Sequence, residues 1–367
     1  MKTKIFCILF ILAVWGFLKH PNWALAQHSS QDPAVQPIQH TLELFSNDFL
    51  VDRPYRSMQG PMETKKFELL ENEKPELLWI VGYQANPVEP DGKKSLSQQF
   101  LCHSNLEFDL PNHRQLFGWN KNGIARVFLM SQGQSEIHFP EGFGIPVMSN
   151  ELMKYETMLL NMNFQGQSFK IKHKLSIHYI RDKDLKKPLK PLYVVGAMGA
   201  KLLQGKDGYY GTEQPDHQMK GMGCSLGMHA LNDDRITFND QYGRKFTGHW
   251  IVKPGREESH TPQKRLWELP FDTTLHYANV HLHPFAESIE LRDLTADKTV
   301  FKSYTRQLDQ GIGLAHVDFF SSEEGVPLYR DHEYELITVY NNTTSENQDA
   351  MSTMLLYVLD PEFKKPA

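Results

Sequence analysis

The chain has 367 residues, a formal net charge of -5 and only three cysteines. It starts with Lys2 and Lys4, continues with an apolar run from Ile5 to Leu18 and reaches Ala24-Leu25-Ala26, a pattern typical of a secretory signal peptide over residues 1–26. Removing that peptide takes away three lysines and no acidic residue, so the net charge moves from -5 to -8. This balance argues against nucleic acid as a partner.

The compartment follows from the same segment. Its apolar run is shorter than the roughly 20 residues that a membrane-spanning helix needs, so we expect no membrane anchor after signal removal. The mature protein is predicted to be exported, either secreted or periplasmic. Cys7 leaves with the signal, and in an oxidising compartment Cys102 and Cys224 most simply form one disulfide. A metal-binding thiolate is the alternative for either cysteine.

Patterning predicts an all-β protein with two domains. Residues 27–45, rich in Gln, Ser, Asp and Pro, are predicted to be a flexible leader. Short apolar or alternating segments with Gly, Pro and Asn between them then fill the chain, and no long segment has a helical period. Such strands indicate β-sandwiches, one over residues 46–187 and one over 188–362. The charged segment 182–191 is the predicted connector.

The strands are predicted from their apolar content. In the first half they are 77–83, 100–108, 125–130, 157–164 and 175–180. In the second half they are 192–200, 246–252, 275–283, 299–304, 315–320, 334–340 and 352–359. A Gly-rich insertion, 205–244, follows the first of these and contains His217, Met219, Met222, Cys224, Met228 and His229.

The strand 275–283 contains the first candidate metal ligands. Because strand side chains alternate, Val280 and Leu282 point to one face, and His281 and His283 point to the other. Two imidazoles two residues apart on one face can bind the same metal ion. Surface histidines on an amphipathic strand are the alternative.

Five segments, one of them the strand of His281 and His283, have an order and spacing in common with a known family. They are Phe139–Gly144, Ile177–Tyr179, Trp250–Gly255, Val280–His283 and Asp349–Met351. Together they resemble the copper type II, ascorbate-dependent monooxygenases, the family of peptidylglycine α-hydroxylating monooxygenase and dopamine β-monooxygenase. The resemblance implies two antiparallel jelly-roll sandwiches that face each other across a solvent-filled cleft, with one copper on each.

The catalytic copper of that family is held by two histidines and one methionine. These positions fall on His281, His283 and Met351, with Met354 as an alternative thioether. Imidazole binds copper in both oxidation states, and a soft thioether favours Cu(I). A core methionine that fills a gap is the alternative for either residue. The resemblance therefore implies one copper ion in the second half.

The family's second copper, which transfers electrons, uses three histidines of the first sandwich. The matching adjacent pair is Cys102-His103, and the third position falls on a strand that offers Asn161 and Asn163 but no histidine. One of three ligands is present, so a second copper is not expected.

Three alternatives for this region stay open. Cys102 and Cys224 form a disulfide that pins the insertion and leaves His103 a bystander, or Cys102, His103 and the insertion make a softer Cu(I) site. The third alternative brings other first-half histidines close in space: His138, His173 or His178.

The substrate contacts also differ from the family pattern. The positions that hold a substrate carboxylate in the peptide-hydroxylating members fall on Asn279, Thr353 and Leu355, and none is a cation. A peptide carboxylate is therefore not expected, although Asn279 and Thr353 stay candidates for lining the cleft. The substrate, a small molecule or a peptide, is not identified by the sequence.

Three functions are compatible with these observations. The first is a monooxygenase-like enzyme that hydroxylates a substrate C–H bond with O2 and an external reductant such as ascorbate. The second is a non-catalytic copper-binding or copper-handling protein that has lost the electron-transfer site. The third is a metal-free structural β-sandwich. The open ligand set favours the enzyme, and the missing first-half histidines favour the second function.

Overall fold

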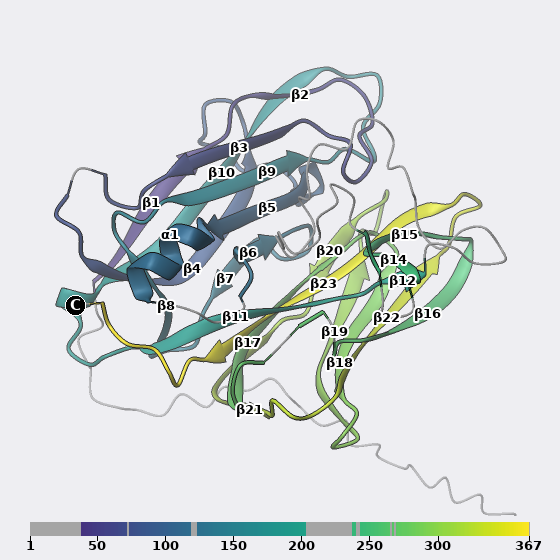
Figure 1. Cartoon of the computed structure of the whole chain (residues 1–367). Coiled ribbons are helices and arrows are strands. Elements are labelled where there is room, and N and C mark those ends of the chain that lie inside the picture. Colours follow the sequence, from purple (N-terminus) through teal and green to yellow (C-terminus); the bar gives the residue numbers. More distant parts are fainter. Residues whose placement is uncertain are drawn as a thin grey trace, which may run out of the picture. The chain divides into compact units, whose positions relative to one another are not determined.

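The computed structural model describes residues 38–71, 73–118, 123–202, 237–239, 243–264, 266–267 and 269–366. These residues form β-strands almost throughout, with one α-helix, α1 (Leu110–Phe117) (Figure 1). The prediction of an all-β protein built from packed, mainly antiparallel sheets is confirmed. No helix among the described residues has the length and apolar character of a membrane span. The predicted signal peptide and most of the predicted leader lie outside the described residues.

The first half forms a sandwich of two sheets. One sheet has the order β1 (Gln39–Phe45), β10 (Phe169–Arg181), β4 (Leu77–Val88) and β8 (Phe143–Met148), with β2 (Phe49–Val51) beside β10 and β7 (Glu136–His138) beside β4. The other has the order β3 (Met62–Phe67), β9 (Met153–Leu159), β5 (Leu101–Phe108) and β6 (Arg126–Met130). Apolar side chains of both sheets form one core between them.

The second half repeats this plan. One sheet has the order β11 (Lys190–Met198), β23 (Gln348–Leu359), β17 (Thr273–Leu282) and β21 (Phe320–Leu328), with β15 (His249–Val252) beside β23. The other has the order β16 (Gly255–Pro262), β22 (Tyr334–Asn342), β18 (Ala286–Asp293), β19 (Lys298–Gln307) and β20 (Leu314–Val317). A small sheet consists of β12 (Lys201–Leu202), β14 (Lys245–Thr247) and β13 (Thr237–Asn239).

The two halves are in direct contact. Strand β11 pairs in parallel with β8, so the larger sheets of the two halves are continuous. The Tyr357 hydroxyl donates to the carbonyl oxygen of Val127 at 2.9 Å, and the side chain of Asn279 donates to that of Leu129 at 2.7 Å. Where the resemblance implied a solvent-filled cleft, buried side chains of both halves share one core.

The start of the first sandwich corrects a prediction. Residues 39–45, placed in a flexible leader, form β1 and pair along their length with β10. Only Leu42 and Leu44 on one face of β1 pack against the core, and two apolar residues were too few to reveal the alternation. The sandwich therefore begins at residue 39 rather than 46.

The helix α1 was not predicted, although its ends carry ordinary signals. The Asp109 side chain accepts a hydrogen bond from the Asn112 backbone N–H at 3.3 Å, and Pro111 lies in the first turn. Gly118 ends the helix with a left-handed backbone, φ 60°. The segment also contains few apolar residues, so only its capping residues indicated a helix.

Candidate metal centre

The candidate ligands lie on three adjacent strands, β15, β23 and β17 (Figure 1). In the antiparallel register His281 is opposite Thr353, and His249 is opposite Met351. Directly opposite residues share a face, and residues two apart on a strand also share a face. His249, His281, Met351 and Thr353 therefore project from the same side of the sheet. Their neighbours on the other side fill the core of the second sandwich.

His281 and His283 are buried, with 1% and 2% of their surface exposed, so the surface alternative does not describe them. Their ring centres are 5.4 Å apart. None of their four ring nitrogens has a hydrogen-bond partner. Leaving one buried polar group unsatisfied costs roughly 1–3 kcal/mol. The pair is thus expensive for the fold unless something binds these nitrogens.

The surroundings keep both rings neutral. Burial, together with the positive charges of His103 and Arg126, lowers the pKa of His281 to about 3. Burial also holds the pKa of His283 well below its ordinary range, against a small opposing effect of the Asp349 backbone. Neutral imidazole is the form that binds a metal ion.

Tyr340 fixes the spacing between His283 and Met351. Its hydroxyl donates to the Met351 carbonyl oxygen at 2.6 Å and accepts from the backbone N–H groups of His283 at 3.1 Å and Met351 at 3.4 Å. Met351 is fully buried. The hydroxyl therefore ties the backbone of one candidate ligand to that of another.

Met354, the alternative thioether, does not share this face. It is opposite Val280 on β17 and Ala197 on β11, and all three belong to the core of the second sandwich. A core position is the alternative for either methionine, and both occupy one: Met354 in the core of the second sandwich and Met351 in the core that the two halves share. Of the two methionines, Met351 is the one on the histidine face.

His249 is a candidate ligand that the sequence analysis missed. Its exposed fraction is 6%, its Nε2 has no hydrogen-bond partner, and its ring centre is 5.6 Å from that of His283. The sequence predicts only a strand over residues 246–252 at this position. One available signal was its alternation with the apolar Trp250 and Val252, which directs His249 away from the core. Its pairing with Met351 cannot be seen in the sequence.

The spacing of the rings fits a shared ion. Two imidazoles bound to one metal at about 2 Å have their ring centres roughly 5–6 Å apart. The separations of 5.4 Å and 5.6 Å agree with this value. In the described part of the chain, however, no three His, Cys, Asp or Glu side chains are already arranged to hold a metal ion. A site of two histidines and one thioether needs only two such side chains, and its nitrogen and sulfur donors suit copper.

The first-half position holds a charge pair instead. His103 is fully buried, and its Nε2 lies 3.5 Å from Oε1 of Glu156. Burial opposes the charged ring, but the hydrogen bonds to Cys102 and Glu156 outweigh it and raise the pKa of His103 to about 9. A protonated histidine is a poor metal ligand. Cys224 and most of the insertion lie outside the described residues, so the disulfide and the softer Cu(I) site stay predictions.

The other polar residues of this region are engaged elsewhere. Asn161 donates to two backbone carbonyls, those of Arg53 and Phe164. Both ring nitrogens of His173 have partners, at 2.7 Å and 3.1 Å, and burial lowers the pKa of His173 to about 3. His138 and His178 stack on each other on β7 and β10, in the sheet opposite that of His103.

The two candidate cleft residues are buried. Asn279 uses its side-chain N–H to bind the Leu129 carbonyl and accepts a hydrogen bond from the Tyr357 hydroxyl at 3.1 Å. Thr353 has no exposed surface and lies opposite His281. Asn279 therefore joins the two halves, and its polar atoms do not face an open cleft.

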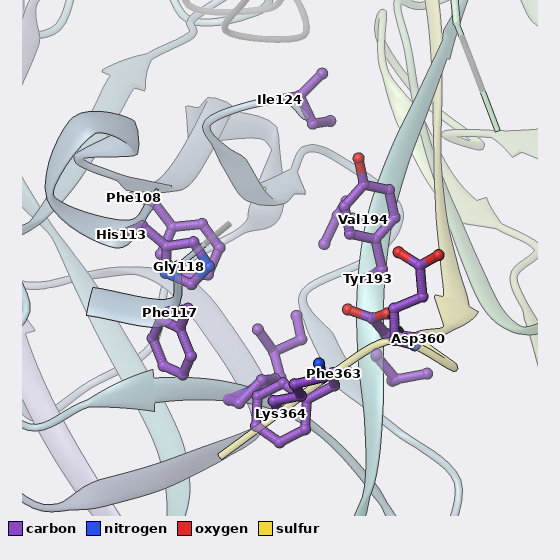
Figure 2. Close-up of a pocket in the computed structure, with 14 residues that line it drawn as sticks. Phe108, His113, Phe117, Gly118, Ile124, Tyr193, Val194, Asp360, Phe363 and Lys364 are labelled. Carbon is purple, nitrogen blue, oxygen red and sulfur yellow. Dashed lines mark hydrogen bonds between the residues drawn. The ribbon is translucent and has the colours of Figure 1, made fainter. Parts of the chain in front are cut away.

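A separate cavity of about 440 Å³ lies beside α1 and β11. Phe108 and Phe117 stand on one side of it, and Tyr193 and Asp360 stand on the other (Figure 2). His113 also lines it, but its Nδ1 lies 2.6 Å from Oε1 of the buried Glu151. No predicted site residue lines this cavity.

Comparison with known proteins gives matches among solved structures and none among family models or curated proteins. A solved peptide-N(4)-(N-acetyl-β-D-glucosaminyl) asparagine amidase is similar over 89% of this chain and 99% of its own, with 9% identity and a TM-score of 0.32. A recombinant peptide:N-glycanase F is similar over 89% of this chain and 98% of its own, with 8% identity and the same TM-score. These scores are too low to establish a common fold.

Proposed function

We propose that the chain is an exported copper protein that holds one ion on His281, His283 and Met351. The observation that carries the proposal is the set of four buried ring nitrogens without hydrogen-bond partners, at a face of the sheet from which the buried Met351 also projects. Imidazole and thioether together favour copper over harder divalent ions, and the thioether favours Cu(I). Bound copper would supply one-electron redox chemistry at this site.

The geometry supports copper binding without catalysis better than it supports an enzyme. The residues that match the electron-transfer ligands are engaged otherwise, with His103 paired to Glu156 and Asn161 bound to backbone carbonyls. The proposed ligands are at most 2% exposed, so a substrate would have little access to them. Both observations favour a protein that retains copper.

A monooxygenase is the second candidate function. It is favoured by the ligand set, because two histidines and one methionine leave a position open for O2. Hydroxylation would consume a C–H bond, one O2, two electrons and two protons, and would give an alcohol and water. An external reductant such as ascorbate would have to supply both electrons. The substrate is not identified.

One experiment tests the proposal. Mature chain lacking residues 1–26 is loaded with Cu(I) without oxygen and dialysed, and bound copper is measured for wild type, His281→Ala and the matched control His276→Ala. His276 is a buried histidine of the same strand whose ring nitrogens both have partners. We expect one copper in wild type and the control, and none in His281→Ala. A wild type without copper would overturn the proposal.

The same samples separate the two candidate functions. O2 consumption is measured with ascorbate after removal of unbound copper. Copper bound without O2 uptake above that of His281→Ala supports the retaining function. Uptake that depends on His281 supports the monooxygenase.

A further inference from the structure

We infer that His249 is a third imidazole ligand of the proposed copper ion, so that three histidines and one methionine would hold it. This inference rests on the proposed function and specifies its ligand set. It would assign the ion to three strands rather than two.

The strand register brings His249 to the site. His249 and Met351 are directly paired residues of β15 and β23. Side chains of such a pair leave the sheet on the same side, with Cβ atoms roughly 5 Å apart. Strand β17, which carries His281, is the neighbour of β23 on the side away from β15. His249 therefore completes a row across three adjacent strands.

The second observation is the state of the His249 ring. The ring is buried, with an exposed fraction of 6%, and its Nε2 has no hydrogen-bond partner. Its ring centre lies 5.6 Å from that of His283, and the two rings are inclined at 72°. The rings of His281 and His283 also have nitrogens without partners. A shared role as metal ligands would explain why the fold tolerates the free-energy cost of burying them.

A small rearrangement is required. The three histidines do not yet have their donor atoms gathered for one ion. The χ2 torsion of histidine has a broad energy profile, so a ring can turn at low cost. The ring nitrogens of His281 have no hydrogen bond to break, and the ring of His283 interacts only weakly with the Asp349 backbone, so turning these rings sacrifices little.

A third imidazole would change what the site can do. Two histidines and one methionine leave a coordination position open, whereas a fourth protein ligand closes a tetrahedral site. A closed site holds its ion and leaves no position for O2. Ligation by His249 would thus favour the copper-retaining function over the monooxygenase.

The test counts ligands directly. Cu(I)-loaded mature chain is measured by X-ray absorption, and carbon monoxide binding is followed by infrared spectroscopy, for wild type and His249→Leu. We expect three nitrogen and one sulfur neighbours and no carbonyl band in wild type. In His249→Leu we expect two nitrogens, one sulfur, a carbonyl band, and a Cu(I) affinity lower by about 10-fold or more.

The outcomes that overturn the inference differ from those that overturn the proposed function. Copper bound in wild type with two nitrogens, one sulfur and the same carbonyl band as in His249→Leu would overturn the role of His249 and leave the copper site intact. A wild type that binds no copper would overturn both. His249→Asn, which keeps a polar side chain of smaller size, repeats the measurement should His249→Leu not fold, and the same ligand counts decide.

Discussion

His249 lies directly opposite Met351 in the pairing of β15 with β23, on the face of the sheet that also carries His281. Both residues are buried, and Met351 belongs to the core that the two halves share. Three imidazoles at neighbouring positions of this sheet bury ring nitrogens without hydrogen-bond partners, which costs the fold free energy. This cost leads to a test in the absence of metal.

Replacing His281 by leucine should stabilise the metal-free protein. Both ring nitrogens of His281 are buried without partners, and removing them recovers roughly 1–3 kcal/mol of desolvation cost. The variant should also lose the stabilisation by copper, which for wild type is about 2.7 kcal/mol at a free Cu(I) concentration 100 times the Kd. Urea unfolding with and without Cu(I) measures both effects.

The matched control is His276→Leu. The ring of His276 donates from Nδ1 to the Ser322 carbonyl oxygen at 3.0 Å, and its Nε2 lies 2.7 Å from the Thr274 hydroxyl, from which the neutral ring accepts a hydrogen bond. Its loss should destabilise the metal-free protein by roughly 1–3 kcal/mol and leave the copper effect unchanged. Equal destabilisation by both variants would contradict the argument from unsatisfied nitrogens.

Tyr340→Phe should weaken copper binding without removing a ligand. The hydroxyl binds the backbone of both His283 and Met351, so its loss frees the spacing between them. Removing such a supporting group commonly lowers metal affinity 10- to 100-fold. Competition with a Cu(I) chelator measures this change. Tyr334→Phe is the control, because the Tyr334 hydroxyl contacts only the backbone of Tyr329; a similar loss of affinity there would point to a general effect of stability.

Breaking the buried ion pair of β5 and β6 should be costly. Arg126 is 1% exposed, and its Nη2 lies 2.7 Å from Oε1 of Glu107, which Lys154 also contacts. Removing one member leaves a buried charge without its partner, so Glu107→Ala should lower the free energy of unfolding by about 3–5 kcal/mol. The exposed pair of Arg306 and Asp309 gives a control, and Asp309→Ala should change stability by less than about 0.5 kcal/mol. Urea unfolding of both variants decides.

The sequence predicted the fold class because the signals for strands are local. Each segment predicted from its apolar content overlaps an observed strand, and alternation separated Val280 and Leu282 from the histidine face. It missed β1, where two leucines carry the whole signal, and α1, where only the caps do. It also missed several other strands, among them β3, β8, β16 and β18. It also could not show that Tyr357 and Asn279 join the halves, because such contacts depend on tertiary packing.

The candidate site was predictable in part for the same reason. Alternation predicts a shared face for His281, on β17, and His283, directly after the end of that strand, from local geometry alone. The choice between Met351 and Met354 required the register of β23, and the arrival of His249 required the pairing of a strand about 100 residues away in the chain. The charge on His103 depends on Glu156, which lies on the neighbouring strand β9.

The last prediction concerns pH. The pKa of His103 is raised to about 9 although burial opposes the charge, because Cys102 and Glu156 bind the ring. In the unfolded chain the pKa of histidine is about 6.5, so the folded protein binds this proton more tightly than the unfolded chain does. The stabilisation is complete below pH 6.5 and is lost as the pH rises through about 9.

Wild type should therefore lose on the order of 1–3 kcal/mol of unfolding free energy between pH 6 and pH 9.5 through this pair. In His103→Gln the loss should disappear, since no proton is taken up on folding at that position. Cys102→Ser separates ionisation of the thiol from that of the ring, because it keeps His103 and Glu156 in place. Parallel pH profiles for wild type and His103→Gln would show that the ring is not charged in the folded protein.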